Sequence, residues 1–448
     1  MWVLAFGAFF NMFVGVDAKI YDAVVIGCGP GGSSASTFLA KAGQKVLVLE
    51  KEIFPRFHIG ESLLPCNMTI FREMGVLPKL RAANFPPKYG AQFELGNSSV
   101  GTRFAFRDGK FNKEPEAIQV ERAKFDHVLL QHARECGADI REGWTVTKTA
   151  SDADGVSVEA RGPDGTLHEF RAAYLIDASG RGNLTGNQEN LREMHPTWKK
   201  LAVFGQFENV GLDSGEARTD TIIVRLENKW FWVIPLDEKK TSVGLVIDKA
   251  EFMNQGTPEE IFQRWIEASP AIKERMKDAR RINEIQTVTD FSYYNRSFVG
   301  DRLLRVGDAA GFMDPIFSAG VFLAMWSGRL AAEIVGNCLA RGRPDNRLLA
   351  KYDKRVRNGI HFYWNVVKNY YTTPFMELFL RPSNHCKLAS AVIAVLAGEV
   401  EGSWDLRWRL KYFWLLVKLQ KYWPIVPRIS FGRSVPRKVR RYELAEGV

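Results

Sequence analysis

The chain has 448 residues, which is enough for two or three lobes around a large hydrophobic core. Hydrophobic residues make up 46% and charged residues 25% of the sequence, a balance that excludes a wholly disordered chain. The net charge is +10, and part of the excess lies in a basic tail at Arg428, Arg433, Arg437, Lys438, Arg440 and Arg441. We interpret this tail as a solvated end rather than a nucleic-acid site, because no nucleic-acid-binding motif accompanies it. The five cysteines are scattered without zinc-type spacing, which predicts no metal site and a reducing, cytoplasmic setting.

Residues 1–16 are almost wholly apolar but match neither of the usual N-terminal segments. A secretory signal needs a positively charged start, and a membrane span needs about 18–20 apolar residues. Two interpretations stay open. The segment is either an overlong start with Met12 as the initiator, which we prefer, or a short hydrophobic anchor with peripheral membrane contact.

A dinucleotide-binding pattern follows this segment. Residues 20–26 predict a buried parallel strand, and Gly27, Gly29 and Gly32 then fit the spacing G-x-G-x-x-G. A predicted helix at 33–42 and a second strand at 44–49 lead to Glu50, where an acidic group should bind a ribose hydroxyl. Glycines permit the close approach of a pyrophosphate, and the helix start stabilises its charge.

Later segments resemble those of flavoprotein monooxygenases and halogenases. The sequence Phe-Pro-Arg-Phe-His-Ile-Gly-Glu-Ser-Leu-Leu-Pro at 54–65 and the strand-plus-glycine segment at 175–181 are similar to segments that flank FAD in those families. The same resemblance implies that Arg122, Asp308 and Gly311 contact FAD. A plain NAD dehydrogenase would need only the first glycine pattern, so the resemblance implies FAD as the cofactor.

The hexapeptide Trp-Phe-Trp-Val-Ile-Pro at 230–235 fits the pattern W-x-W-x-I-P. Here the chain resembles the flavin-dependent halogenases, the family often labelled tryptophan-halogenase-like. The resemblance implies that Trp230 and Trp232 shape the cavity beside the flavin and keep an organic substrate away from it. Two alternatives stay open: a strand whose aromatic side chains pack an interdomain core, and the similar motif of flavin reductases that act on isoprenoid chains.

Lys88 lies in the sequence Pro-Pro-Lys-Tyr-Gly, where it matches the lysine that halogenases place between the flavin and the aromatic substrate. The resemblance therefore implies a catalytic role. An ammonium group can hold hypohalous acid, and a desolvated neutral amine can instead form a haloamine. On its own, a lysine in such a setting is most often a surface residue.

The loop at 314–321 narrows the substrate through the same resemblance. Pro315 and Phe317 are expected at the cavity, and Phe317 stands where halogenases of free tryptophan carry a glutamate. The resemblance is therefore to the subgroup that halogenates phenols and pyrroles, free or tethered to an acyl or peptidyl carrier protein. Backbone N–H groups of Ser318, Ala319 and Gly320 are expected to bind the halide.

Two further expectations concern what is absent from the motifs. No second G-x-G-x-x-G follows a strand, which fits an enzyme that receives reduced FAD from a separate flavin reductase. Of the seven histidines only His58 lies in a motif, and we expect it to pack in the core.

Strand-like runs at 222–226, 230–234 and 242–247 predict a sheet that floors the substrate cavity. The predicted fold is α/β: a three-layer, Rossmann-like FAD-binding domain with an inserted β-sheet substrate domain and a helical C-terminal region. The expected boundaries are an apolar extension (1–18), the first part of the FAD-binding domain with a substrate-side insertion near 86–118 (19–185), the substrate-side sheet (186–289), the second part of the FAD-binding domain (290–340) and the helical region (341–448).

The predicted function is an FAD-dependent halogenase that uses reduced FAD, O2 and chloride or bromide on an electron-rich aromatic. Three alternatives stay open: an FAD-dependent monooxygenase, a polyprenyl (geranylgeranyl-type) reductase, and a non-catalytic, membrane-associated flavoprotein. The basic, aromatic-rich segment at 404–423 could lie on a membrane or dock a carrier protein, but we favour helices packed on the FAD domain with basic solvent faces.

Overall fold

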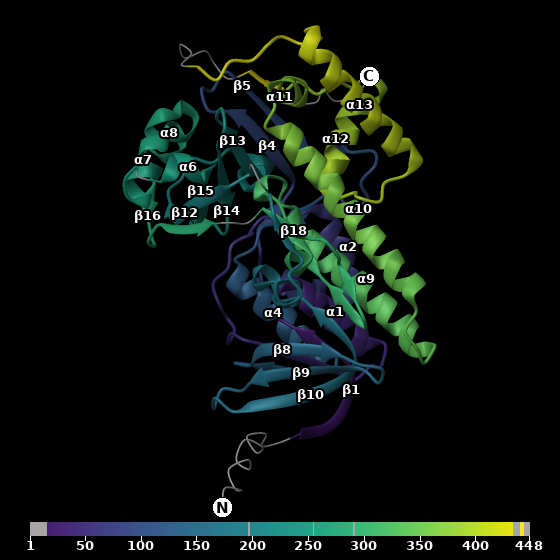
Figure 1. Cartoon of the computed structure of the whole chain (residues 1–448). Coiled ribbons are helices and arrows are strands. Elements are labelled where there is room, and N and C mark those ends of the chain that lie inside the picture. Colours follow the sequence, from purple (N-terminus) through teal and green to yellow (C-terminus); the bar gives the residue numbers. More distant parts are fainter. Residues whose placement is uncertain (1–15, 196–197, 254, 290–291, 433–439, 443–448) are drawn as a thin grey trace, which may run out of the picture.

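The computed structural model describes residues 16–195, 198–253, 255–289, 292–432 and 440–442. Almost all of the apolar N-terminal segment lies outside these residues, as do Arg433, Arg437 and Lys438 of the basic tail. Figure 1 shows two large sheets stacked along the molecule, with the C-terminal helices running beside both.

The first sheet has eight strands and carries the dinucleotide pattern. Its path is β19-β20-β10-β1-β2-β7, with β9 beside β10 and β8 beside β9. Strand β1 pairs in parallel with β2 and β10, so the centre of the sheet is parallel and buried on both faces. The bounds are β1 (Val16–Ile26), β2 (Val46–Glu50), β7 (Asp139–Glu142), β8 (Thr145–Ser151), β9 (Val156–Arg161), β10 (Leu167–Asp177), β19 (Val299–Gly300) and β20 (Leu303–Arg305).

Helices pack against this sheet and bring the two nucleotide segments together. Helix α1 (Pro30–Lys41) lies against α9 (Ala319–Ala340), which begins in the loop at 314–321. The two helices approach so closely at Gly328 that a Cβ atom there would lie 2.4 Å from the carbonyl oxygen of Gly31. Helix α4 (Arg122–Glu135) also packs on α1, and α10 (Asn346–Tyr370) covers α9.

The second sheet has nine strands in the path β16-β12-β15-β14-β13-β4-β5-β22, with β17 beside β12. It confirms the three predicted strands as β13, β14 and β15, and it also contains β4 and β5 from the insertion near 86–118. The bounds are β4 (Gly90–Leu95), β5 (Val100–Ala105), β12 (Lys200–Glu208), β13 (Thr221–Arg225), β14 (Trp230–Pro235), β15 (Thr241–Asp248), β16 (Arg280–Arg281), β17 (Gln286–Thr289) and β22 (Arg440–Tyr442).

Strand β14 is buried on both faces, and its alternation divides its side chains between two cores. Trp230, Trp232 and Ile234 belong to the main core, whereas Phe231 and Val233 pack toward α7 (Pro258–Ala268). The tryptophans of the hexapeptide therefore point toward the core that they share with β1 and β2 of the first sheet.

The remaining elements are short or belong to the C-terminal region. Helices α11 and α12 join the main core, and every residue of α12 is buried. In the described part of the chain, no helix is both long and apolar enough to cross a membrane. The other bounds are α2 (Pro65–Met74), α3 (Leu77–Ala82), β3 (Pro87–Lys88), β6 (Ala117–Ile118), α5 (Leu184–Gln188), β11 (Arg192–Met194), α6 (Lys249–Phe252), α8 (Pro270–Met276), β18 (Tyr293–Asn295), β21 (Gly311–Phe312), α11 (Thr373–Phe379), α12 (Leu388–Ala397) and α13 (Trp404–Tyr422).

Candidate functional site

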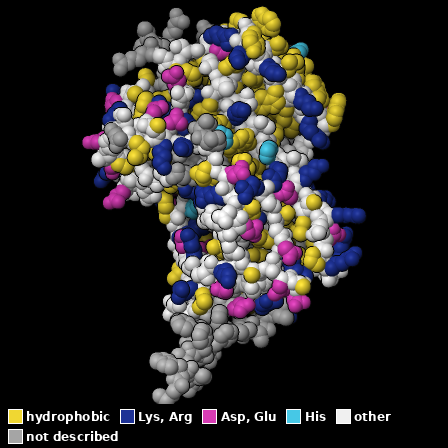
Figure 2. All heavy atoms as spheres, in the orientation of Figure 1, with side chains coloured by type: hydrophobic (Ala, Val, Ile, Leu, Met, Phe, Trp, Pro, Cys, Tyr) yellow, Lys and Arg dark blue, Asp and Glu magenta, His cyan; other side chains and the backbone are white. Residues whose placement is uncertain are grey.

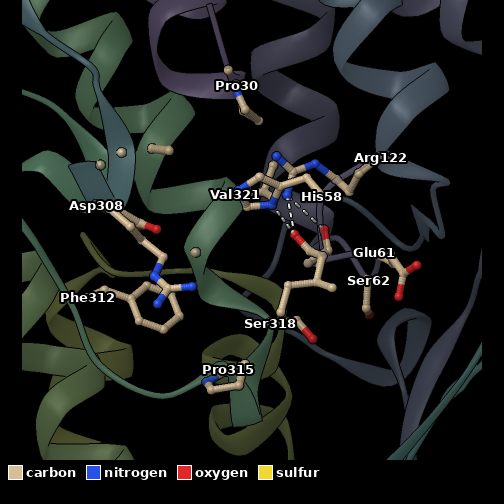
Figure 3. A pocket seen from close by; sticks show the side chains of 18 of the residues that line it. Pro30, His58, Glu61, Ser62, Arg122, Asp308, Phe312, Pro315, Ser318 and Val321 are labelled. Atoms are coloured by element: carbon tan, nitrogen blue, oxygen red, sulfur yellow. Dashed lines mark hydrogen bonds between the residues drawn. The ribbon is translucent and has the colours of Figure 1, made fainter. Parts of the chain in front are cut away.

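A cavity of about 200 Å³ lies between the first sheet and β14 of the second. Its walls come from segments that are far apart in the sequence: the start of α1, the loop at 58–62, the start of α4, the loop after β20 and the start of α9. Figure 3 shows side chains from several of these segments facing one another across this space. The predicted site residues that line it are Gly29, Arg122, Trp230, Trp232, Asp308, Pro315, Ser318 and Gly320.

The glycine turn before α1 is fixed by backbone packing. Gly27 has φ +89°, and a Cβ atom there would lie 2.6 Å from the carbonyl oxygen of Ala178. At Gly32 a Cβ atom would lie 1.9 Å from the carbonyl oxygen of Gly27. Gly29 instead faces the cavity, where the first turn of α1 offers N–H groups to an anion.

Glu50 ends β2 beside this turn and is buried. Its carboxylate accepts hydrogen bonds from the backbone N–H groups of Cys28, at 2.6 Å, and Glu52, at 2.9 Å. It is not one of the residues that line the cavity. Its position at the carboxyl end of the strand is the one from which an acid reaches a ribose hydroxyl.

Arg122 is held rigidly at the cavity wall by the first turn of its own helix. Its guanidinium donates to both carboxylate oxygens of Asp126, at 2.8 and 2.9 Å, and to the carbonyl oxygen of Ile59 at 2.6 Å. The last of these bonds, drawn in Figure 3, ties α4 to the loop at 58–62. The bidentate pair with Asp126 keeps the positive charge in place.

Asp308 faces the cavity from the other side, after β20 (Figure 3). Burial raises the pKa of its carboxyl to about 6, and the nearby Arg181 and Arg122 oppose the shift. Among the described residues no donor bonds to this carboxylate, so it is available to a ligand hydroxyl. A half-buried free acceptor, a fixed arginine and a helix start around one cavity fit a bound FAD.

Gly311 and Ala319 do not line this cavity. They border a smaller space of about 20 Å³ behind it, together with Asp314 and Trp326. This second space shares Gly307, Asp308, Phe312 and Gly320 with the first.

The expectation that His58 packs in the core is wrong. Its side chain is exposed and lines the cavity beside Arg122 (Figure 3). The protein groups that crowd the ring at the cavity and the positive charge of Arg122 both lower its pKa. The imidazole is therefore neutral at pH 7, and its Nδ1 lies 2.7 Å from the carbonyl oxygen of Ile59.

The two tryptophans of β14 stand side by side at the cavity, with ring centroids 6.0 Å apart. The indole N–H of Trp230 donates to the hydroxyl of Tyr371 at 2.9 Å, and that of Trp232 donates to Ser242 at 3.1 Å. Gly244 lies opposite Trp232 in β15, and a Cβ atom there would lie 2.2 Å from the indole ring. The position of Trp232 therefore depends on a glycine in the neighbouring strand.

Lys88 is buried at the end of β3, next to the cavity but not on its wall. Its amine donates to the hydroxyl of Ser62 at 2.8 Å and to the carbonyl oxygen of Leu63 at 3.0 Å. Burial lowers the pKa of Lys88 from 10.5 to about 7, and Asp220 opposes the shift. Near neutral pH the amine is thus present in both protonation states.

Two hydroxyl groups connect Lys88 to the cavity. Ser62 and Thr221 both line it, and their oxygens lie 2.6 Å apart. Glu61, the residue before Ser62, also lines the cavity, and burial raises its pKa to about 7 despite hydrogen bonds from Ser242 and Gln206. Sequence reasoning named none of these as site residues, although Glu61 and Ser62 stand in the segment that resembles flavoproteins.

In the loop at 314–321, Phe317 turns away from the cavity. Its ring packs 5.6 Å from that of Tyr370 and 6.4 Å from that of Phe93. The N–H of Ser318 donates to the carbonyl oxygen of Pro315 at 3.0 Å, so it is not free for a halide. The N–H groups of Ala319 and Gly320 lie in the first turn of α9, where helix geometry leaves them without helical partners.

Tyr371 belongs to the site, although no sequence motif marks it. Its hydroxyl accepts from Trp230 and donates to a carboxylate oxygen of Asp314 at 2.8 Å. Burial raises the pKa of Asp314, while the hydrogen bond from Tyr371 lowers it. This hydrogen-bonded chain joins β14, the loop at 314–321 and the end of α10.

Comparison with known proteins supports the assignment of the cavity to FAD. The family described as FAD binding domain matches residues 20–369. The chain is 32% identical over 375 residues to a chlorinase of 1H-pyrrole-2-carbonyl-(peptidyl-carrier protein) from Pseudomonas fluorescens, covering 78% of this chain and 83% of that protein. It is 33% identical to tryptophan 2-halogenase of Chondromyces crocatus, covering 77% and 66% of the two chains. The solved structure of the flavin-dependent brominase Bmp2 superposes with a TM-score of 0.80 at 30% identity, covering 90% of this chain and all of that one.

Proposed function

Because this chain belongs to the flavin-dependent halogenases within the FAD-binding-domain family, we propose that Lys88 delivers the halogen to an electron-rich aromatic substrate. The observation that carries the proposal is the buried amine of Lys88, held by Ser62 beside a cavity with two tryptophans on its wall. The enzyme is an FAD-dependent oxidoreductase, and its reaction class is halogenation of an aromatic compound.

Different residues around the cavity would bind different parts of FAD. The first turn of α1 would bind the pyrophosphate, Glu50 a ribose hydroxyl, and Asp308 a hydroxyl of the flavin chain. Arg122, fixed by Asp126, would hold positive charge at the wall. When bound in reduced form, FAD supplies the electrons with which O2 and a halide give hypohalous acid.

Lys88 would take up that acid at its amine. In the neutral form, the nitrogen lone pair can attack the halogen, so that an N–X bond forms and water leaves; the arene then accepts X and returns a proton to the nitrogen. In the ammonium form, the N–H donors can hold and polarise the acid. Because the pKa of Lys88 is about 7, both routes are open near neutral pH.

Ser62 would control access to that amine. Its hydroxyl accepts from Lys88 and also lies on the cavity wall, so it links the cavity to Nζ. Trp230 and Trp232 would keep the organic substrate away from the flavin. The free N–H groups of Ala319 and Gly320 would bind the halide at the start of α9.

The substrate class that we propose is a phenol or pyrrole, with a carrier protein as the bearer of the substrate and a separate flavin reductase as the source of reduced FAD. The ring of Phe317 packs on Phe93 and Tyr370, so position 317 offers no carboxylate to a substrate, which supports this class. One similar protein is a chlorinase of carrier-bound pyrrole. Another is a tryptophan 2-halogenase, so free tryptophan belongs in the test panel.

The experiment supplies the protein with FAD, a flavin reductase, O2 and bromide. The panel contains a free phenol, a free pyrrole, pyrrole-2-carboxyl thioester on a carrier protein, and tryptophan. Mass spectrometry should find the bromine isotope doublet on a phenol or on a free or carrier-bound pyrrole. Bromination of tryptophan alone would contradict the proposed substrate class, and oxygenated products without bromine would contradict halogenation.

A further inference from the structure

Helix α13 exposes apolar side chains that a soluble helix normally buries. Its inner face packs through Leu406, Leu410, Phe413 and Val417 at helical spacing. Five of the large hydrophobic residues exposed in the described part of the chain nevertheless lie in or directly after this helix. They are Trp404 (75% exposed), Leu415 (50%), Tyr422 (68%), Trp423 (68%) and Ile425 (48%).

Cations alternate with these residues on the same outer face. The exposed basic residues of the helix are Arg407, Lys411, Lys418 and Lys421. Asp405 is the only acidic residue between 404 and 432, and Arg409 pairs with it. None of the four exposed cations has an acidic partner among the described residues. Figure 2 shows hydrophobic side chains gathered over the C-terminal helices, with Lys and Arg side chains among them.

We propose that this outer face, from Trp404 to Ile425, binds the surface of an anionic lipid bilayer. Trp and Tyr rings stand near both ends of a helix about 28 Å long, so the apolar groups are spread along a line. Such rings favour the headgroup level of a bilayer, with an apolar body and a polar edge. Lysine side chains between them can extend their amines to lipid phosphates.

Other occupants fit this face less well. A second copy of the chain would place the four cations opposite their own equivalents, which costs free energy. An acidic protein would complement the charge, but protein interfaces concentrate their aromatic anchors at a desolvated centre. Of the exposed large hydrophobic residues of this face, Leu415 is the one near the centre, and the three aromatic ones lie at the ends. A flat surface with negative charge matches this distribution.

The test is co-sedimentation of the full chain with vesicles. We expect binding to vesicles of equal parts phosphatidylglycerol and phosphatidylcholine, and little binding to pure phosphatidylcholine. The double variant Lys411→Gln/Lys418→Gln should reduce the partition coefficient about 25-fold, since each cation near an anionic surface contributes about fivefold. Trp404→Ala/Trp423→Ala should reduce it by about tenfold or more through lost apolar burial. Salt at about 1 M, where the screening length is about 3 Å, should release the wild-type protein.

A matched control carries Ile282→Ala and Lys239→Gln, two exposed positions in the region of the second sheet. This control should bind vesicles as the wild type does, and all variants should halogenate a soluble substrate at the wild-type rate. Equal binding to neutral vesicles, or binding that the α13 variants leave unchanged, would overturn the proposal. The proposal would also be overturned if the protein bound an acidic carrier protein through this face but did not bind anionic vesicles.

Discussion

Lys88→Met should make the protein more stable at acidic pH while it abolishes halogenation. The pKa of Lys88 is lowered from 10.5 to about 7 because the amine is buried. The unfolded chain therefore binds a proton at this amine more tightly than the native protein does. The free energy of unfolding is lowered at every pH at which the amine is protonated in the unfolded chain. The lowered pKa reduces the stability of the native state by roughly 5 kcal/mol below pH 7 and by roughly 2 kcal/mol at pH 9.

Methionine has a similar shape without the charge, so it removes this cost. It also removes the donors that bond to Ser62 and Leu63, at about 1 kcal/mol each. We therefore expect the variant to be more stable than the wild type by roughly 3 kcal/mol at pH 6 and about equal to it at pH 9. Stability of the wild type alone should rise as pH increases from 7 toward 10.5.

The assay has two readouts. Urea unfolding followed by circular dichroism at pH 6, 7.5 and 9 gives the free energy of unfolding for both proteins. Bromination of the best substrate, with FAD binding measured alongside, gives the activity. We expect a loss of at least about 100-fold in product formation with FAD binding retained.

Lys229→Met is the matched control, because that lysine is also buried but pairs with Glu251 at 2.8 Å. It should lower stability at all three pH values and retain bromination. If Lys88→Met lowers stability at pH 6, the assigned cost of the buried ammonium is wrong. If the variant brominates at the wild-type rate, Lys88 has no catalytic role.

The remaining predictions concern the cavity walls. Gly32→Ala should prevent FAD binding, measured by flavin absorbance after dialysis, because its Cβ atom would meet the carbonyl oxygen of Gly27; normal loading would refute this reading of the turn. Gly244→Ala should displace the Trp232 indole, so we expect oxygenated or uncoupled products to rise relative to brominated ones in mass spectra. Glu61, with its pKa raised from 4.5 to about 7, makes the native state bind more protons than the unfolded chain in that window, so stability should fall as pH rises through it. In the Glu61→Gln variant, the free energy of unfolding measured in urea should depend less on pH in this range. An unchanged pH dependence would show that another group causes the fall.

Local sequence patterns were sufficient for the parts of the site that depend on neighbouring residues. The turn at Gly27–Gly32 and the acid Glu50 lie within one strand-helix-strand unit, so their spacing alone predicted their arrangement. The alternation of β14 likewise belongs to one strand. Pairing between distant strands was not predictable in this way. The parallel pairing of β4 with β13, which joins the insertion to the second sheet, leaves no local pattern.

The same distinction explains the positions of Lys88, Phe317 and His58. The family motif located Lys88 along the chain, but its separation from the cavity depends on Ser62, which a different loop supplies. Phe317 turns away because rings from β4 and α10 surround it, and neither neighbour is visible from the loop itself. The expectation that His58 packs in the core fails because Arg122, on a different element, binds the carbonyl oxygen of Ile59 and holds the loop of His58 at the cavity.

The C-terminal region completes the site, although its sequence was the least informative. Tyr371 follows α10, and its single hydroxyl accepts from Trp230 and donates to Asp314. The tryptophan that should exclude the substrate and the loop that should bind the halide are therefore positioned by one side chain outside the nucleotide-binding segments. Since Lys200 and Arg225 also lie 4.6 and 5.0 Å from the Tyr371 ring, the second sheet holds this residue as well. A motion of α10 relative to that sheet would thus change the cofactor side and the halide side of the cavity together.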